Sequence, residues 1–130
     1  MSSRADFSDR RQIIVFFSSG SASGVLTQRL VDDLRCQLVE RDTDVRFVDI
    51  AELPDTISAT ENRDEPSLLH KLVLLRSEER LDFEMVLIGK DGGVKARTDN
   101  PEALNEFLAM IDTMPMRRAE IRSRGKADCQ

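Results

Sequence analysis

The stretch Gln12–Phe17 (QIIVFF) constrains the fold more than any other part of the sequence. It is a continuous apolar run of strand length, which is typical of a strand that is covered on both faces of its sheet. A strand with one wet face would alternate apolar and polar residues instead. We therefore expect residues 12–17 to form a central strand of an α/β fold.

A helix and a second strand are predicted next. After the serine- and glycine-rich stretch 18–24 (SSGSASG), apolar residues recur at helical spacing as far as Arg41 and Asp42, namely Leu26, Leu30, Val31, Leu34 and Leu38. Residues 44–50 (DVRFVDI) then alternate as in a strand. A strand, a helix and a strand in this order nearly always form a right-handed crossover, so the two strands should be parallel.

The remaining elements are predicted from the spacing of apolar residues and from the prolines at element boundaries. Residues 52–65 are polar and show no period, so they indicate a long surface loop. We expect a second helix from Pro66 to near Glu79, and strands over residues 83–89 and 94–97. A third helix should begin near Pro101 and end at Met114-Pro115. The basic stretch after it is expected to add one helical turn before the chain frays.

Two glycines follow a Lys-Asp pair in residues 87–97 (LIGKDGGVKAR), a pattern that fits either a phosphate loop or a hairpin turn. A phosphate loop would lead into a helix N-terminus, so that unpaired N–H groups face the anion. Here the glycines lead into the strand-like residues VKAR. Asp-Gly between two strands is a strong hairpin signal, and it favours a type I′ turn with positive φ at both central residues.

The predicted order is β-α-β-α-β-β-α, which is the order of the thioredoxin core. We therefore predict a thioredoxin-like α/β fold with a four-stranded mixed sheet and helices on both faces. At 130 residues the chain is expected to form a single domain over 1–130. Residues 1–10 and 122–130 are expected to be flexible tails.

The chain also resembles the P-DUDES domains, a largely uncharacterised thioredoxin-like family. Four segments carry the resemblance: Arg11–Phe17, Glu40–Ile50, Phe83–Arg97 and Ile111–Ile121. Such domains occur as stand-alone bacterial proteins and as modules of extracellular sushi-repeat and coiled-coil-domain-containing proteins. The resemblance implies the thioredoxin-like fold and no agreed enzymatic activity. For animal members it implies a link to adhesion and matrix assembly, and a relation to peroxiredoxins has been proposed from the fold.

Composition argues against several classes of function. The net charge is −5 and the chain has no Trp or Tyr, so we expect no nucleic-acid binding. One histidine, His70, and two distant cysteines argue against a metal site, and no cofactor is expected. The N-terminus has no long apolar run, so we expect no membrane span. The expected location is the cytoplasm, or the periplasm or outside the cell if a leader has been removed.

The position of the reactive cysteine in thioredoxin-like enzymes, the start of the first helix, falls in the serine-rich stretch 18–24. No catalytic residue is predicted, because serine cannot replace a thiol in disulfide exchange and His70 has no evident partner. The alternatives for this stretch are a capped helix start and an anion site formed by Ser18, Ser19, Ser21 and Ser23. Cys36 is expected to be an ordinary surface thiol, with a redox role as the alternative.

Basic residues offer one further candidate surface. Lys90, Lys95, Arg97, Arg117 and Arg118 would form a basic patch if the last helix ends beside the hairpin. Ion pairs with Glu40, Asp42 or Asp112 are the alternative. The leading hypothesis is a non-catalytic binding module for an unknown protein or a small anionic ligand, as a monomer or weak homodimer. The rivals are an antioxidant-type oxidoreductase that uses Cys36 and an anion or nucleotide binder at residues 18–24.

Overall fold

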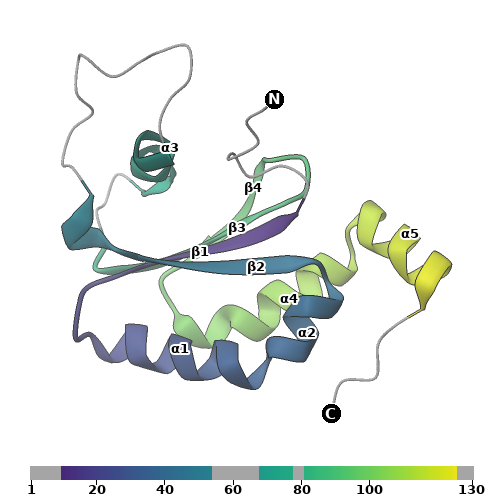
Figure 1. Ribbon diagram of the computed structural model, residues 1–130, viewed down its shortest axis with the longest axis horizontal. Helices are drawn as coiled ribbons and strands as arrows, with labels where there is room; N and C mark the ends of the chain where they lie inside the picture. Colours follow the sequence, from purple (N-terminus) through teal and green to yellow (C-terminus); the bar gives the residue numbers. More distant parts are fainter. Residues whose placement is uncertain (1–9, 54–67, 78–80, 126–130) are drawn as a thin grey trace.

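The computed structural model describes residues 10–53, 68–77 and 81–125. Its centre is a four-stranded mixed sheet in the order β2-β1-β3-β4 (Figure 1). The strands are β1 (Arg11–Phe17), β2 (Thr43–Asp49), β3 (Phe83–Ile88) and β4 (Val94–Thr98). β1 pairs in parallel with β2 and antiparallel with β3, and β3 pairs antiparallel with β4. The predicted α/β class, internal first strand and closing hairpin are confirmed.

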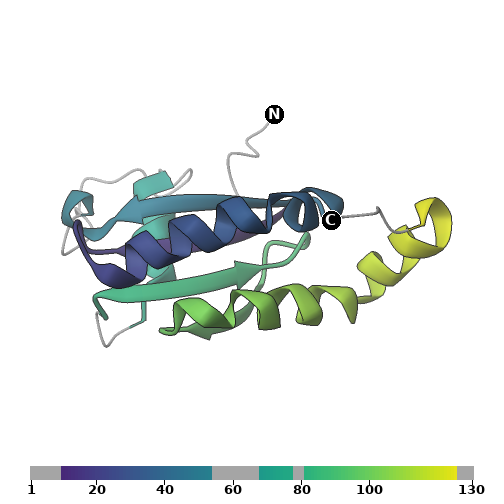
Figure 2. The same cartoon turned by 90° about the horizontal axis from the view of Figure 1, so that it is seen from below.

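Helices cover both faces of this sheet, as the sequence predicts. On one face lie α1 (Ala22–Asp33), α2 (Arg35–Glu40) and α4 (Leu104–Asp112), and on the other lies α3 (Leu68–Leu75) (Figures 1 and 2). Short 3-10 turns, Ile50–Glu52 and Pro101–Ala103, follow β2 and precede α4. The loop predicted over residues 52–65 and the predicted ends of the second helix, Pro66 and Glu79, lie mostly outside the described residues.

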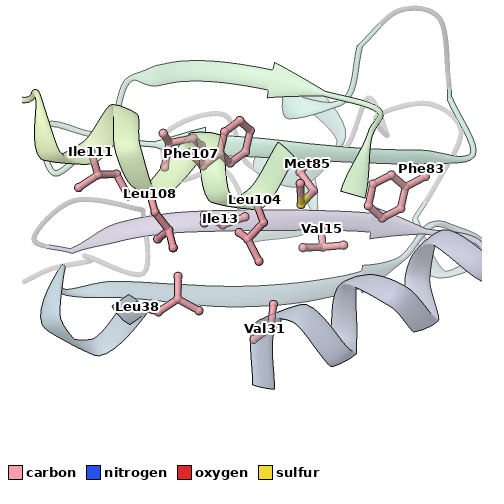
Figure 3. Close-up of a cluster of buried hydrophobic side chains, with 11 residues drawn as sticks. Ile13, Val15, Val31, Leu38, Phe83, Met85, Leu104, Phe107, Leu108 and Ile111 are labelled. Carbon is pink, nitrogen blue, oxygen red and sulfur yellow. The ribbon is translucent and has the colours of Figure 1, made fainter. Parts of the chain in front are cut away.

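Each face of the sheet has its own apolar core. Side chains of β1 alternate between them: Ile13 and Val15 face α1 and α4, while Ile14 and Phe16 face α3. All four are completely buried, which explains why the first strand is apolar at every position from 13 to 16. Figure 3 shows the larger core, where Leu104, Phe107, Leu108 and Ile111 of α4 meet the sheet.

The first helix differs from the prediction, because it is broken at Leu34. α1 ends at Asp33 and α2 starts at Arg35, with Leu34 between them at φ −104° and ψ 18°. The N–H of Leu34 still donates to the carbonyl of Leu30, so the chain bends without losing this hydrogen bond. Leu34 is neither glycine nor proline, and the sequence therefore carries no residue that marks the break.

The C-terminal segment also differs from the prediction. Met114-Pro115 does end α4, but Pro115 then opens a further helix, α5 (Pro115–Arg124), which is longer than the single expected turn. Proline is well suited to the first position of a helix, where its missing N–H costs nothing. Helical structure thus continues past residue 122, where the sequence predicts a flexible tail. α5 leaves the helical layer and projects beyond the end of the sheet (Figures 1 and 2).

The stretch 87–97 forms a hairpin, which settles the choice between a turn and a phosphate loop. The predicted type I′ turn is wrong, however, because positive φ occurs at Gly92 (85°) and not at Asp91. The N–H of Gly92 donates to the Gly89 carbonyl, and the N–H of Gly89 donates to the Gly93 carbonyl. This is a three-residue loop that ends in a left-handed glycine, and it is accompanied by a register shift between Leu87 and Ile88.

Candidate functional site

A groove of about 450 Å³ opens where β1 ends and α1 begins. Phe17, the last residue of β1, and Phe47 of β2 line it, with their ring centroids 6.1 Å apart in an edge-to-face arrangement. β1 and β2 are parallel, so the groove lies near their carboxyl ends. Open α/β sheets bind ligands preferentially outside the carboxyl ends of their strands.

The predicted anion-binding serines surround the start of α1. Ser18 and Ser19 belong to the turn after β1, Ser21 is the N-cap of α1, and Ser23 lies in its first turn. Of these, Ser21 lines the groove. Its hydroxyl accepts a hydrogen bond from the Gly24 N–H at 3.1 Å, so it caps the helix. The carbonyl of Ser18 accepts from the Ser21 N–H at 2.9 Å. Anion binding by these serines stays a prediction.

Gly24 sets how closely α1 approaches the sheet. A Cβ at this position would lie 3.3 Å from the Cβ of Phe17 and 3.1 Å from the hydroxyl of Ser21, closer than side chains normally pack. On the rim of the groove, Val25 is 57% exposed, and Arg29 is exposed with no ion pair to the described residues. The groove therefore combines an apolar wall with one available cation.

A second polar feature, which the sequence analysis missed as a unit, lies at the other end of β1. There, side chains from β1, α2, the hairpin, α4 and α5 form one network of ion pairs, which we call the charge network. Its cations are Arg11, Arg41, Lys90, Arg117 and Arg124, and its carboxylates are Glu40, Asp42, Asp112 and Glu120. It joins α5 to the rest of the fold.

Arg117 is the centre of this network. Its side chain is completely buried, and it donates to the Glu40 carboxylate at 2.8 Å and to Asp112 at 3.0 Å. It also donates to the backbone carbonyl of Glu40 at 3.2 Å. Planar guanidinium groups suit such sites because they hold several acceptors in fixed directions. Arg117 therefore ties α5 to the ends of α2 and α4.

The same pattern repeats nearer the sheet. The buried Arg11 side chain donates to the Arg41 carbonyl at 2.7 Å and contacts Glu120 of α5 at 3.2 Å. Lys90, in the hairpin loop, donates to Glu120 at 2.7 Å and to Asp42 at 3.0 Å. Asp42 has positive φ (51°), which Asp tolerates better than most residues, and this turn after α2 carries its carboxylate to Lys90.

The charge network lowers the pKa values of three of its carboxylates. Burial acts to raise the pKa of Asp112, but hydrogen bonds from Arg41 and Arg117 outweigh it, so the pKa lies below its ordinary value. Lys90 and Arg124 lower the pKa of Asp42 against the same effect of burial, and Lys90 and Arg11 lower that of Glu120. These carboxylates are therefore ionised in the folded protein at neutral pH.

The structure does not gather the predicted basic patch into one exposed surface. Arg117 is buried and Lys90 is 15% exposed, because both form ion pairs within the charge network. Lys95 pairs with Asp91 at 2.9 Å, and Arg97 pairs with Glu84 at 3.5 Å. The alternative drawn from the sequence, ion pairs with Glu40, Asp42 and Asp112, describes Arg117 and Lys90 correctly. Arg118 is exposed on α5.

The prediction of an ordinary surface thiol at Cys36 needs a correction. The residue is exposed on α2, as its helical position predicts, but it takes part in a disulfide bond, so it is not the ordinary thiol we expected. Cys129, the other cysteine of the sequence, lies outside the described residues. Neither the groove nor its rim contains cysteine or histidine among the described residues that line it.

Two other kinds of site are absent from the described residues. Within them, no cluster of His, Cys, Asp or Glu could hold a metal ion. None of the helices in the described part of the chain has the length and hydropathy that crossing a bilayer requires.

Comparison with known proteins gives one match. Residues 5–120 match the model of a family described as a domain of unknown function, DUF4174. The match covers the groove and every member of the charge network except Arg124. Comparisons with curated proteins and with solved structures gave no match.

Proposed function

The chain belongs to the DUF4174 family, a domain of unknown function, and on that premise we propose that it is a non-catalytic binding module on a thioredoxin-like scaffold. The sheet order, the parallel pair β1 and β2 and the closing hairpin support this scaffold. The same features, with the resemblance of residues 11–17 and 83–97, support the narrower assignment to the P-DUDES domains.

The observation that carries the proposal is the groove beside Phe17 and Phe47. It has the size and apolar lining of a small binding site, and it lies where ligands bind in open α/β sheets. Its residues do not supply a nucleophile with a base: the Ser21 hydroxyl caps α1, and Asp32 pairs with Arg35 at 2.8 Å. Binding, rather than covalent chemistry, is what this arrangement supports.

The lining also suggests the character of the ligand. An apolar group would lie against the rings of Phe17 and Phe47, and a negative group would lie near the available cation of Arg29. A small anionic molecule or a protein segment with an apolar side chain next to an acidic one has both groups. The rival redox function lacks this support, because Cys36 is disulfide-bonded and lies on α2, outside the groove lining.

The test is a thermal-shift screen of anions, nucleotides and small aromatic carboxylates, followed by two matched variants. Val25→Glu places a carboxylate on the groove rim, one helical turn from Arg29, and Leu74→Glu makes the same change at a residue of similar exposure (57% and 62%) on α3, across the sheet. We expect a hit that stabilises wild type and Leu74→Glu equally but loses its effect on Val25→Glu. A hit that stabilises all three proteins equally would place the site elsewhere.

A further inference from the structure

A second cavity, of about 330 Å³, lies between the hairpin loop and the start of α5, and we call it the hairpin pocket. Met114, Pro115 and Met116 form its apolar wall, and Lys90, Lys95 and Arg11 bring cations to it. Arg11 opens β1 whereas Phe17 closes it, so this pocket and the groove lie at opposite ends of that strand. An inference about one is therefore independent of the other.

The start of α5 has backbone donors with no acceptor among residues 10–53, 68–77 and 81–125. Met114 is the N-cap of this ten-residue helix but makes no side-chain capping bond, and Pro115 has no N–H. The first intrahelical hydrogen bond runs from the Arg118 N–H to the Met114 carbonyl. The N–H groups of Met116 and Arg117 precede it, and a helix N-terminus of this kind attracts negative charge.

The buried side chain of Arg11 also has a donor without an acceptor, and this does not depend on the start of α5. Its side chain is 1% exposed and lines the hairpin pocket, and its Nε has no hydrogen-bond partner in the described part of the chain. The other guanidinium nitrogens are occupied by the Arg41 carbonyl and Glu120. A buried N–H without an acceptor is costly, and it marks a position where an added acceptor would stabilise the protein.

Lys95 completes the polar end of the pocket. Its ammonium is paired with Asp91, whose side chain is 63% exposed, so this ion pair is weak and can exchange for a bound anion. Lys90 differs, because Glu120 and Asp42 already hold it. The pocket therefore joins a cationic end, built from Lys95, Arg11 and the start of α5, to a wall of flexible methionine side chains.

We propose that the hairpin pocket binds a small amphipathic carboxylate, that is, an aliphatic acid of short to medium chain length. Its carboxylate would lie near Lys95 and the N–H groups of Met116 and Arg117, and its aliphatic chain against Met114 and Met116. An inorganic anion would leave the apolar wall unused. A neutral alcohol would leave the cationic end unsatisfied.

The test is titration of the full ¹⁵N-labelled chain with octanoate, compared with acetate and octanol. Octanoate should give saturable amide shifts at Met116, Arg117 and the hairpin, and it should bind about tenfold more tightly than either comparison compound. Equal affinity for octanol, equal affinity for acetate, or octanoate shifts confined to the groove residues Ser21 and Gly24 would overturn the proposal.

Two variants separate binding from folding. Lys95→Met should weaken octanoate about tenfold, whereas Arg118→Met, a loss of the same charge at an exposed α5 position outside the pocket, should not. Met116→Glu, at a residue that is 53% exposed, should place a carboxylate at the pocket and abolish octanoate binding without changing the melting temperature. Unchanged octanoate affinity in Lys95→Met or in Met116→Glu would refute the site.

Discussion

Replacing Arg117 by methionine should destabilise the protein more than the loss of any other charged side chain on α5. The side chain is completely buried, and methionine keeps its apolar stem while removing the guanidinium. The Glu40 carboxylate, 8% exposed, would lose its 2.8 Å partner, and its contact with Arg41 is longer, at 3.5 Å. Asp112, 26% exposed, would keep Arg41 at 2.8 Å.

The size of this loss of stability follows from the Glu40 carboxylate, which loses its buried partner. Breaking a buried ion pair by removing one partner costs about 3–5 kcal/mol, and Asp112 adds little because water reaches it and Arg41 still pairs with it. We expect a loss of about 3 kcal/mol in the free energy of unfolding. The assay is urea denaturation at neutral pH, where the midpoint should fall while the m-value stays the same.

Arg118→Met is the matched control. Arg118 is the next residue on α5, but its side chain is exposed, so its loss should change stability by no more than about 0.5 kcal/mol. If Arg117→Met and Arg118→Met unfold at the same urea concentration, the charge network does not hold α5 to the sheet. A large drop in the m-value would show instead that α5 or its surroundings had already unfolded.

Other predictions concern protonation, backbone strain and redox activity. The folded-state pKa values of Asp42, Asp112 and Glu120 lie below their ordinary values. The stability that these carboxylates contribute should therefore be present near neutral pH and lost as the pH falls through about 4 and below. Urea midpoints measured across this pH range should fall less steeply in Glu120→Gln than in wild type. Gly92→Ala should cost about 1 kcal/mol through its positive φ alone, since open space surrounds a Cβ there, whereas Gly93→Ala should cost less; equal melting temperatures would contradict this. Insulin reduction and peroxide consumption with a thiol donor should stay at background, and turnover that disappears in Cys36→Ser would overturn the binding assignment.

The sheet could be predicted from the sequence because its signals are local and consistent. A strand that is apolar at every position from 13 to 16 must be covered on both faces, and a helix between two strands imposes the parallel crossover. Asp91-Gly92 between two strands marks a hairpin. The turn type is harder to predict, since a three-residue loop and a two-residue loop both place a glycine at positive φ, and they differ by one position of register.

Single ion pairs of the charge network could be predicted from the sequence, but the network as a unit could not, because its members look like ordinary surface charges. Arg11, Glu40 and Arg117 belong to separate segments, and only the fold brings them together. One signal was present: each segment that carries the family resemblance includes a charged residue of the network, beside an apolar run. No residue in the sequence marks the break at Leu34. The length of α5 is harder to predict because Pro115 both ends one helix and starts the next.

The most direct test of the central claim, that this chain binds through the groove at the end of β1, is chemical-shift mapping with an unbiased fragment library. ¹⁵N-labelled protein would be titrated with fragments chosen without regard to charge. We expect the tightest fragments to shift the amides of Gly20, Ser21, Gly24 and Phe47 together, and Val25→Glu to remove these shifts. Fragments that bind tightly elsewhere and leave these amides unchanged would contradict it.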